Sequence, residues 1–224
     1  MKQLLVIEAH SDDSAISALG FLEKYRSDYE YHFALASVSA LNMHHAGAIS
    51  REQRLEEYAC YIDHLGATWH KIDGLPFDAD ARLDMMPKRD LVAAFEKVIS
   101  TVRPDVLICQ GPSFHHDHTI TYEATIAATR PTAQFCPAEI YVMENPTYVH
   151  SLGPTTDFKA TTYCALTEQQ IDHKLETFRL CFPSQIREGQ NYLSPEGIKA
   201  WARYRGIECR NEFAEAFQTY IRVV

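Results

Sequence analysis

Short apolar runs alternate with amphipathic stretches along most of this chain. Continuous apolar runs of this kind are typical of strands that are covered on both faces, as in parallel sheets. We expect strands at residues 3–9, 31–40, 68–73, 105–109 and 139–143.

Between these runs, apolar side chains recur at helical spacing in two places. One stretch begins near residue 51 and ends at Gly66, a residue type that commonly terminates helices. The other covers residues 87–102, with Pro87 near the start of the helix. Both stretches predict helices with one apolar face that can cover a sheet.

Strands that alternate with helices predict an α/β fold, an open and mostly parallel sheet flanked by helices on both faces. We expect a single domain over residues 1–224, with a core at 1–145 and a C-terminal part at 157–224. In that part the pattern predicts one strand and then three helices, at residues 158–166, 168–181, 195–204 and 211–221.

Composition narrows the possible functions. Of the 224 residues, 46% are apolar and 23% are charged, as in an average globular protein. The 30 acidic residues outnumber the 21 basic ones and leave a net charge of -9, and the basic residues form no cluster suited to phosphate backbones. We therefore expect a small-molecule partner and no nucleic acid.

Cysteine usage and hydropathy indicate the compartment. The six cysteines are scattered and form no C-x-x-C pair. No stretch approaches the roughly 20 apolar residues that span a bilayer, and residues 1–8 are too weakly apolar for a signal peptide. These features predict a cytoplasmic protein with reduced thiols and no membrane span.

Two polar clusters follow predicted strands. Residues 10–13 (H-S-D-D) come after the first strand, and residues 111–118 (G-P-S-F-H-H-D-H) come after the strand at 105–109. Sites in open α/β sheets form at the carboxyl ends of strands. We therefore expect the two clusters to converge in space.

The first set of side chains suits a catalytic metal. His10, Asp13 and His118 would give a zinc ion three protein ligands and leave open positions for water and substrate. Zinc lowers the pKa of its bound water towards about 7. Asp12 is placed to take the proton from that water.

A second pair of residues could complete the chemistry. A cationic His115, oriented by Asp117, could hold an oxyanion and protonate a leaving amine. Each cluster alone also fits a simpler interpretation, a helix N-cap for the Asp pair or a solvated turn for the histidines. Two metal-capable clusters that both follow buried strands favour a functional site.

Other polar residues are placed near the same edge of the sheet. Arg54, in the helix after the second strand, could bind a phosphate or carboxylate of the substrate. The alternative for Arg54 is a structural pair with Glu57, one turn along the helix. Asn145 to Tyr148 also follow a predicted strand, and their polar groups could contact sugar hydroxyls.

The two clusters carry a resemblance to a known family. Residues 9–13 (A-H-S-D-D) resemble the A-H-P-D-D motif of PIG-L/LmbE-like deacetylases, and residues 115–118 (H-H-D-H) resemble their H-P-D-H motif. Residues 54–57 (R-L-E-E) and the closing residues 212–217 (E-F-A-E-A-F) are weaker marks of the same family.

The resemblance implies a Rossmann-like fold and a zinc-dependent hydrolase. Its substrate would be a small N-acetylamino sugar or sugar conjugate, commonly of the N-acetylglucosamine type, from which the enzyme removes the acetyl group. The implied cofactor is Zn²⁺, with Fe²⁺ as an alternative, and homo-oligomers are common in the family. The family's roles fall on the same residues: metal ligands His10, Asp13 and His118, general base Asp12, and acid His115 with its orienting partner Asp117.

The sequence departs from the family pattern at Ser11, Ser14 and His116, which replace proline, glutamate and proline, and at Ser113, where members can carry tyrosine. Two alternatives stay open. The protein could deacylate another small N-acyl amine, because water activation does not select the acyl group, or it could be a non-catalytic sugar- or metal-binding member. A nucleotide-binding protein is disfavoured, since an acidic turn stands where a G-x-G-x-x-G motif would be needed.

Overall fold

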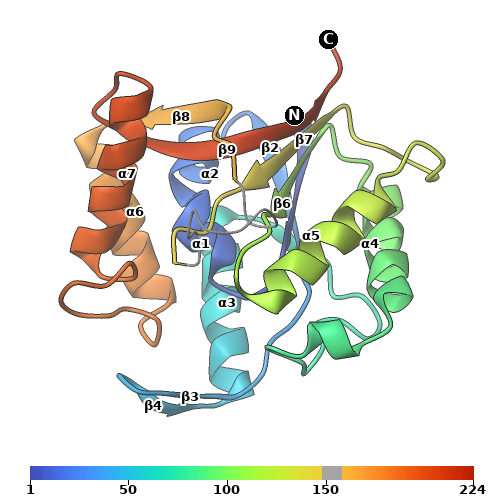
Figure 1. Cartoon of the computed structure of the whole chain (residues 1–224), viewed down its shortest axis with the longest axis horizontal. Coiled ribbons are helices and arrows are strands. Elements are labelled where there is room, and N and C mark those ends of the chain that lie inside the picture. Colours follow the sequence, from blue (N-terminus) through green and yellow to red (C-terminus); the bar gives the residue numbers. More distant parts are fainter. Residues whose placement is uncertain (148–157) are drawn as a thin grey trace.

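A seven-stranded sheet runs through the computed structural model, which describes residues 1–147 and 158–224 (Figure 1). The strands lie in the order β5-β2-β1-β6-β7-β9-β8. Their bounds are β1 Lys2–Glu8, β2 Tyr29–Leu35, β5 Thr68–Trp69, β6 Val106–Gln110, β7 Glu139–Met143, β8 Thr162–Leu166 and β9 Phe213–Arg222.

Strand direction confirms the predicted mostly parallel sheet. β5, β2, β1, β6 and β7 pair in parallel, and only β9 runs antiparallel to both of its neighbours, β7 and β8. From β1 the chain first moves outward through β2 and β5, and it later returns to place β6 and β7 on the other side. The reversal of strand order therefore lies between β1 and β6, where open sheets of this kind form their binding crevice.

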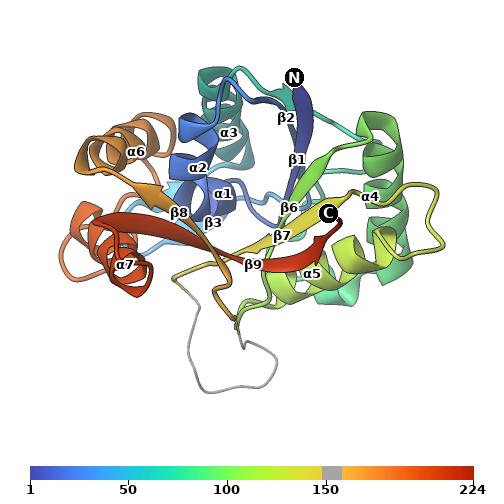
Figure 2. The same ribbon diagram turned by 90° about the horizontal axis from the view of Figure 1, so that it is seen from above.

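Helices cover both faces of the sheet, as predicted (Figure 2). On one side lie α1 (Asp13–Ser17), α2 (Leu19–Lys24), α3 (Arg51–Leu65), α6 (Glu168–Cys181) and α7 (Pro195–Glu208). On the other side lie α4 (Lys88–Val102) and α5 (His116–Ala128), with the short 3-10 helix η1 (Leu83–Met85). Within the described residues, no helix is long and apolar enough to cross a membrane.

The alternation of side chains along β1 divides the core into two layers. Leu4 and Val6 point into the cluster beneath α1, α2, α3 and α6, whereas Leu5 and Ile7 point into the cluster beneath α4 and α5. All four side chains are buried completely. Because both faces of β1 are covered by helices, neither set of its alternating side chains meets water. This explains the continuous apolar run.

Several predicted boundaries are shifted. The strand expected at 31–40 ends at Leu35, and the loop after it contains a small hairpin of β3 (Leu41–Met43) and β4 (Gly47–Ile49). The strand expected at 68–73 keeps only Thr68 and Trp69, because it pairs with the edge of β2 over just two positions. The helix after β4 ends as predicted at Gly66, which has a left-handed conformation with φ 65°.

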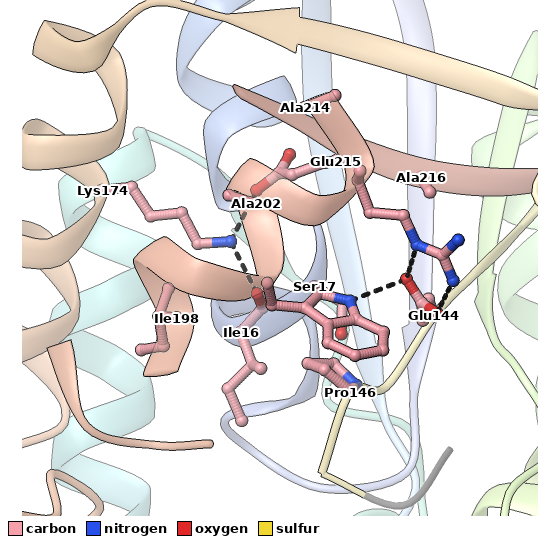
Figure 3. Close-up of a pocket in the computed structure, with 12 residues that line it drawn as sticks. Ile16, Ser17, Glu144, Pro146, Lys174, Ile198, Ala202, Ala214, Glu215 and Ala216 are labelled. Atoms are coloured by element: carbon pink, nitrogen blue, oxygen red, sulfur yellow. Dashed lines mark hydrogen bonds and ion pairs between the residues drawn. The ribbon is translucent and has the colours of Figure 1, made fainter. Parts of the chain in front are cut away.

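The helix predicted at residues 211–221 is wrong, because this segment forms β9 in the middle of the mixed part of the sheet. β9 hydrogen bonds to β7 on one side and to β8 on the other. Its Glu215 accepts hydrogen bonds from the backbone nitrogens of Gly20 (2.8 Å) and Phe21 (2.7 Å), and it pairs with Lys174 Nζ at 2.6 Å. Figure 3 shows Lys174 directed toward Glu215.

Candidate metal centre and active site

The two polar clusters lie side by side at the carboxyl ends of β1 and β6. His10 follows β1, and Asp12 and Asp13 stand at the start of α1. On the other strand, His115 is the N-cap residue of α5, and His118 lies in the first turn of that helix. The expected convergence is confirmed, because neighbouring parallel strands bring their carboxyl ends to one edge of the sheet.

The three predicted ligands face one another. His10 Nδ1 lies 3.1 Å from His118 Nε2, and the Asp13 carboxylate lies 3.7 Å from His10 Nδ1 and 3.3 Å from His118 Nε2. Ligand atoms bound at about 2.0 to 2.1 Å around a tetrahedral zinc are separated by about 3.3 Å. The two Asp13 distances join different oxygens, Oδ2 for His10 and Oδ1 for His118, so these donors lie close to the spacing that one zinc ion requires.

His115 lies next to this group. The donor atoms of His10, His115 and His118 all lie within 4.8 Å of one another, and the ring centroids of His10 and His115 are 4.5 Å apart. His115 is therefore a further candidate ligand by distance. Its Nδ1, however, accepts a hydrogen bond from the backbone nitrogen of Asp117 at 3.3 Å and so caps α5.

The electrostatics of the centre favour a cation. Burial alone would lower the pKa of His10, but the hydrogen bond to Asp117 and the charge of Asp13 raise it to about 9. Burial alone would raise the pKa of Asp13, yet the His118 and His10 rings hold it well below its usual range. Without a bound ion, a protonated His10 supplies the positive charge that these buried carboxylates require, and a divalent ion would take the place of that proton.

An outer layer of contacts fixes the orientation of the proposed ligands. Asp117 is buried, and its carboxylate lies 3.0 Å from His10 Nε2. The same carboxylate accepts hydrogen bonds from the backbone nitrogens of Ala81 (2.5 Å) and Leu83 (3.0 Å). A carboxylate behind the second nitrogen of a ligating histidine is the usual way that proteins orient such a ring.

Two further residues orient the other ligands. Ser113 Oγ lies 2.8 Å from His118 Nδ1, on the ring nitrogen that faces away from the centre. Asn145 Nδ2 donates to Asp13 Oδ1 at 3.1 Å. The sequence suggested a sugar contact for Asn145, but its side chain donates to Asp13, and Tyr148 lies outside the described residues.

The structure differs from the expected pairing of Asp117 with a cationic His115. The Asp117 carboxylate points to His10, whereas His115 uses its ring to cap the helix. Burial, together with the charges of His10 and His118, lowers the pKa of His115 to about 4. The ring of His115 is therefore neutral near pH 7, with its proton on Nε2.

Asp12 faces the same cavity as the ligands. It occupies the N-cap position of α1, but its side chain makes no capping hydrogen bond within the described part of the chain. Burial and the charge of Asp13 raise the pKa of Asp12, and Arg54 opposes this shift. The capping interpretation therefore does not account for Asp12, and a raised pKa suits a proton acceptor.

The centre opens into a cavity of about 720 Å³, including the space at its mouth. Arg54 lines this cavity and is 2% exposed. Its Nη1 donates to the Ser39 carbonyl at 2.9 Å and pairs with Asp80, while Glu57 accepts hydrogen bonds from Ser184 instead. The pairing of Arg54 with Glu57 is therefore wrong.

Sequence reasoning missed several residues of the site. Asp80, Ala81 and Leu83 belong to the loop and short helix that follow β5, a segment without a recognisable motif. Ser113 was noted only as a departure from the family pattern. In the sequence, only their position just after strands indicates that Ser113 and Asn145 lie at the functional edge of the sheet.

The sequence matches a family model described as "PIG-L: GlcNAc-PI de-N-acetylase" over residues 5–129. This range includes both polar clusters and all the predicted ligands. No curated protein matches the sequence.

Solved structures share the fold over nearly the whole chain. The 4-carboxy-2-hydroxymuconate hydratase of Pseudomonas putida KT2440 is 20% identical, with a TM-score of 0.73 and coverage of 100% of this chain and 98% of that one. A deacetylase of the teicoplanin biosynthetic pathway is 15% identical, with a TM-score of 0.70 and 97% coverage of both chains. The N,N'-diacetylchitobiose deacetylase of Pyrococcus horikoshii is 17% identical, with a TM-score of 0.66 and coverage of 97% and 83%.

Proposed function

The chain belongs to the PIG-L family of GlcNAc-PI de-N-acetylases, and from this membership we propose that it is a zinc-dependent N-deacetylase. Its substrate would be a small N-acetylamino sugar or sugar conjugate of the N-acetylglucosamine type. The reaction is hydrolysis of the amide, which releases acetate and a free amine.

One observation carries the proposal. His10, Asp13 and His118 meet at the reversal point of the sheet with donor distances of 3.1 to 3.7 Å, and Asp12 faces the same cavity. A structural zinc site is normally closed by four protein ligands, whereas a catalytic site keeps a position open. Three ligands at the floor of an open cavity therefore support catalysis.

The ligand roles follow from the contacts. We assign the metal to His10 Nδ1, His118 Nε2 and the Asp13 carboxylate, with Zn²⁺ preferred and Fe²⁺ as the alternative. A bound divalent ion there would activate a water and polarise the acyl oxygen. Asp117 and Ser113 act as positioning residues, because each holds the second ring nitrogen of a ligating histidine.

Asp12 is the proposed general base. A carboxylate whose pKa is raised by burial can take a proton from the attacking water and still release it later. The residue adjoins Asp13, so its side chain is carried on the same turn that presents a ligand. Removal of the carboxylate should leave the metal ligands in place.

His115 is the proposed donor to the substrate. Its Nδ1 accepts a hydrogen bond from the Asp117 backbone, so the ring proton lies on Nε2. A neutral imidazole can still donate a hydrogen bond to the oxyanion of the tetrahedral intermediate. The departing amine takes the proton that Asp12 removed from the water, so acetate and a free amine leave and Asp12 returns to its carboxylate form.

Arg54 is the proposed substrate contact. The buried Nε of Arg54 and that of Arg187, both of which line the cavity, have no hydrogen-bond partner within the described residues. A buried donor without a partner is costly, so a ligand that supplies an acceptor would bind well. Sugar hydroxyls, a phosphate or a carboxylate could each supply one.

The experiment is an assay of released acetate. Zinc-loaded protein is incubated with N-acetylated monosaccharides, sugar conjugates and simple N-acyl amines, with and without a chelator that is later replaced by excess zinc. We expect acetate from one sugar class, loss of release with the chelator and recovery with zinc. Release of acetate from simple N-acyl amines alone would show that the substrate is such an amine and not a sugar. No release by the metal-loaded protein would favour a non-catalytic binding member.

A second candidate function is addition of water to an unsaturated carboxylate. The hydratase among the structural neighbours shows that the fold also carries a hydratase, and the two arginines that line the cavity, Arg54 and Arg187, would suit a carboxylate. Loss of ultraviolet absorbance of an unsaturated dicarboxylate, without release of acetate from any N-acetyl sugar, would favour this candidate.

A further inference from the structure

Away from the catalytic cavity, metal-binding side chains from three helices converge. Glu23 belongs to α2, His64 to the last turn of α3 and His173 to α6, and their donor atoms all lie within 4.8 Å of one another. Figure 2 shows these three helices on the same side of the sheet. Within the described part of the chain, this cluster shares no residue with the lining of the catalytic cavity.

The geometry of the cluster is that of a ligand set. The two histidines approach different oxygens of one carboxylate, with His64 Nε2 at 2.9 Å from Glu23 Oε1 and His173 Nε2 at 3.3 Å from Glu23 Oε2. Neighbouring ligand atoms around a tetrahedral zinc are separated by about 3.3 Å. A small change of rotamer would therefore place one ion between all three side chains.

The surroundings are also those of a metal site. Thr177, one turn after His173 on α6, donates its hydroxyl proton to Glu23 Oε1 at 2.9 Å and fixes the orientation of the carboxylate. The side chain of Glu23 is 12% exposed and that of His64 23%, whereas that of His173 is 55% exposed. Two ligands are thus held in place, and the third stands at the solvent side, where water can complete the coordination.

We propose that Glu23, His64 and His173 form a second zinc-type metal site that joins α2, α3 and α6. The ion takes two nitrogens and one oxygen from the protein, and water in the fourth position. Three protein ligands and a water are also the pattern of a reactive ion, but among the described residues this cluster shares none with the lining of the catalytic cavity and ties an N-terminal helix to a C-terminal one, so we assign the ion to stability. Binding to the folded chain alone stabilises that state by mass action.

A thiol pair between the same two helices, α3 and α6, offers a competing site. Cys60 on α3 and Cys181 on α6 have their sulfur atoms 3.3 Å apart, and thiolates are strong zinc ligands. Any zinc bound between these helices must therefore be assigned to the histidines or to the thiols by substitution.

The test is the zinc content after equilibrium dialysis of the reduced full chain at micromolar free zinc. His118→Ala removes the catalytic ligand, and His173→Ala removes the exposed ligand of the second site. We expect each single variant to lose one equivalent relative to the unmodified chain, and the double variant to lose both. If no metal binds at the catalytic site, His118→Ala would have the same zinc content as the unmodified chain, whereas His173→Ala would still contain one equivalent less. The two proposals can therefore fail independently.

Controls decide the assignment. Glu176→Ala removes an exposed carboxylate from the same helix, and Cys60→Ser removes the thiol pair; both should retain the zinc. Zinc should also raise the Tm of His118→Ala but not that of the double variant. Full zinc retention by His173→Ala, equal loss in Glu176→Ala, or loss only in Cys60→Ser would each overturn the proposal.

Discussion

At the scale of single residues, the site depends on what stands behind each ligating ring. The outward nitrogen of His10 faces Asp117, and that of His118 faces Ser113. Each contact leaves the other ring nitrogen directed at the centre and sets which nitrogen carries the proton. Ser113, at one departure from the family pattern, thus contacts a proposed ligand.

The convergence of the proposed ligands could be predicted from the sequence, but the residues that support them could not. His10, Asp13 and His118 follow the buried strands β1 and β6, so topology brings them to one edge of the sheet. The partner of Asp117 depends instead on side-chain rotation at the start of α5, where His115 takes the cap. Asp80 comes from a loop without periodicity, and no pattern connects it with Arg54.

Glu8 gives a prediction for the pH dependence of stability. It lies wholly buried behind the site, where Tyr58 and the backbone of Ser14 donate to it, and burial raises its pKa from 4.5 to about 8. Because the pKa of Glu8 is higher in the folded chain than in the unfolded chain, the contribution of Glu8 to stability is full below pH 4.5. This contribution is lost as the pH rises to about 8. At 1.36 kcal/mol per pKa unit, the decline is on the order of 5 kcal/mol.

Urea unfolding of the chelator-treated protein between these pH values measures the effect. Glu8→Gln cannot titrate, so its free energy of unfolding should fall less with pH than that of the unmodified chain. Glu176→Gln, at an exposed carboxylate, serves as the control. Parallel pH profiles for Glu8→Gln and the unmodified chain would show that Glu8 is ionised throughout.

At the scale of elements, the last strand shows where local sequence misleads. Residues 212–217 (E-F-A-E-A-F) are rich in alanine and glutamate, which favour helices. The gap between β7 and β8 offers backbone partners on both sides, and these override the local preference. Phe213, Glu215 and Phe217 then alternate as strand residues, a period of two that is hard to recognise when one of them is charged.

Loss of the charged member should destabilise this element strongly. Glu215→Ala leaves the buried Lys174 with the Ile16 carbonyl but without its charged partner, and it removes the acceptor for two backbone N–H groups. We expect the free energy of unfolding to fall by about 3 to 5 kcal/mol. Glu123→Ala breaks an exposed pair with Lys88 and should cost at most about 1 kcal/mol. Urea unfolding compares the two, and similar losses would contradict a role for the buried pair.

At the scale of the whole molecule, the C-terminal part is built into the same sheet as the N-terminal core. β9 separates β7 from β8, and Glu144, just after β7, pairs with Arg205 of α7. Alternating strands and helices sufficed to predict the parallel core. The way in which the C-terminal part joins it depends on contacts between residues distant in the sequence, which periodicity does not report.

This arrangement predicts that the C-terminal strand is required for folding. Deletion of residues 213–224 removes the pairing partner of β7 and β8 together. We expect this variant to lose its cooperative urea transition. Deletion of Val223 and Val224 alone, which are exposed, should leave the transition nearly unchanged. A cooperative transition in the longer deletion would contradict the single-domain account.

The central claim is that His10, Asp13 and His118 hold a metal on which Asp12 acts as the base. The most direct test measures zinc content and acetate release side by side for Asp12→Ala and His118→Ala, both in a His173→Ala background so that one site is counted. Asp12→Ala should keep its zinc and lose activity by about 100-fold or more, whereas His118→Ala should lose both. Equal loss of zinc in the two variants, or an active Asp12→Ala, would contradict the account.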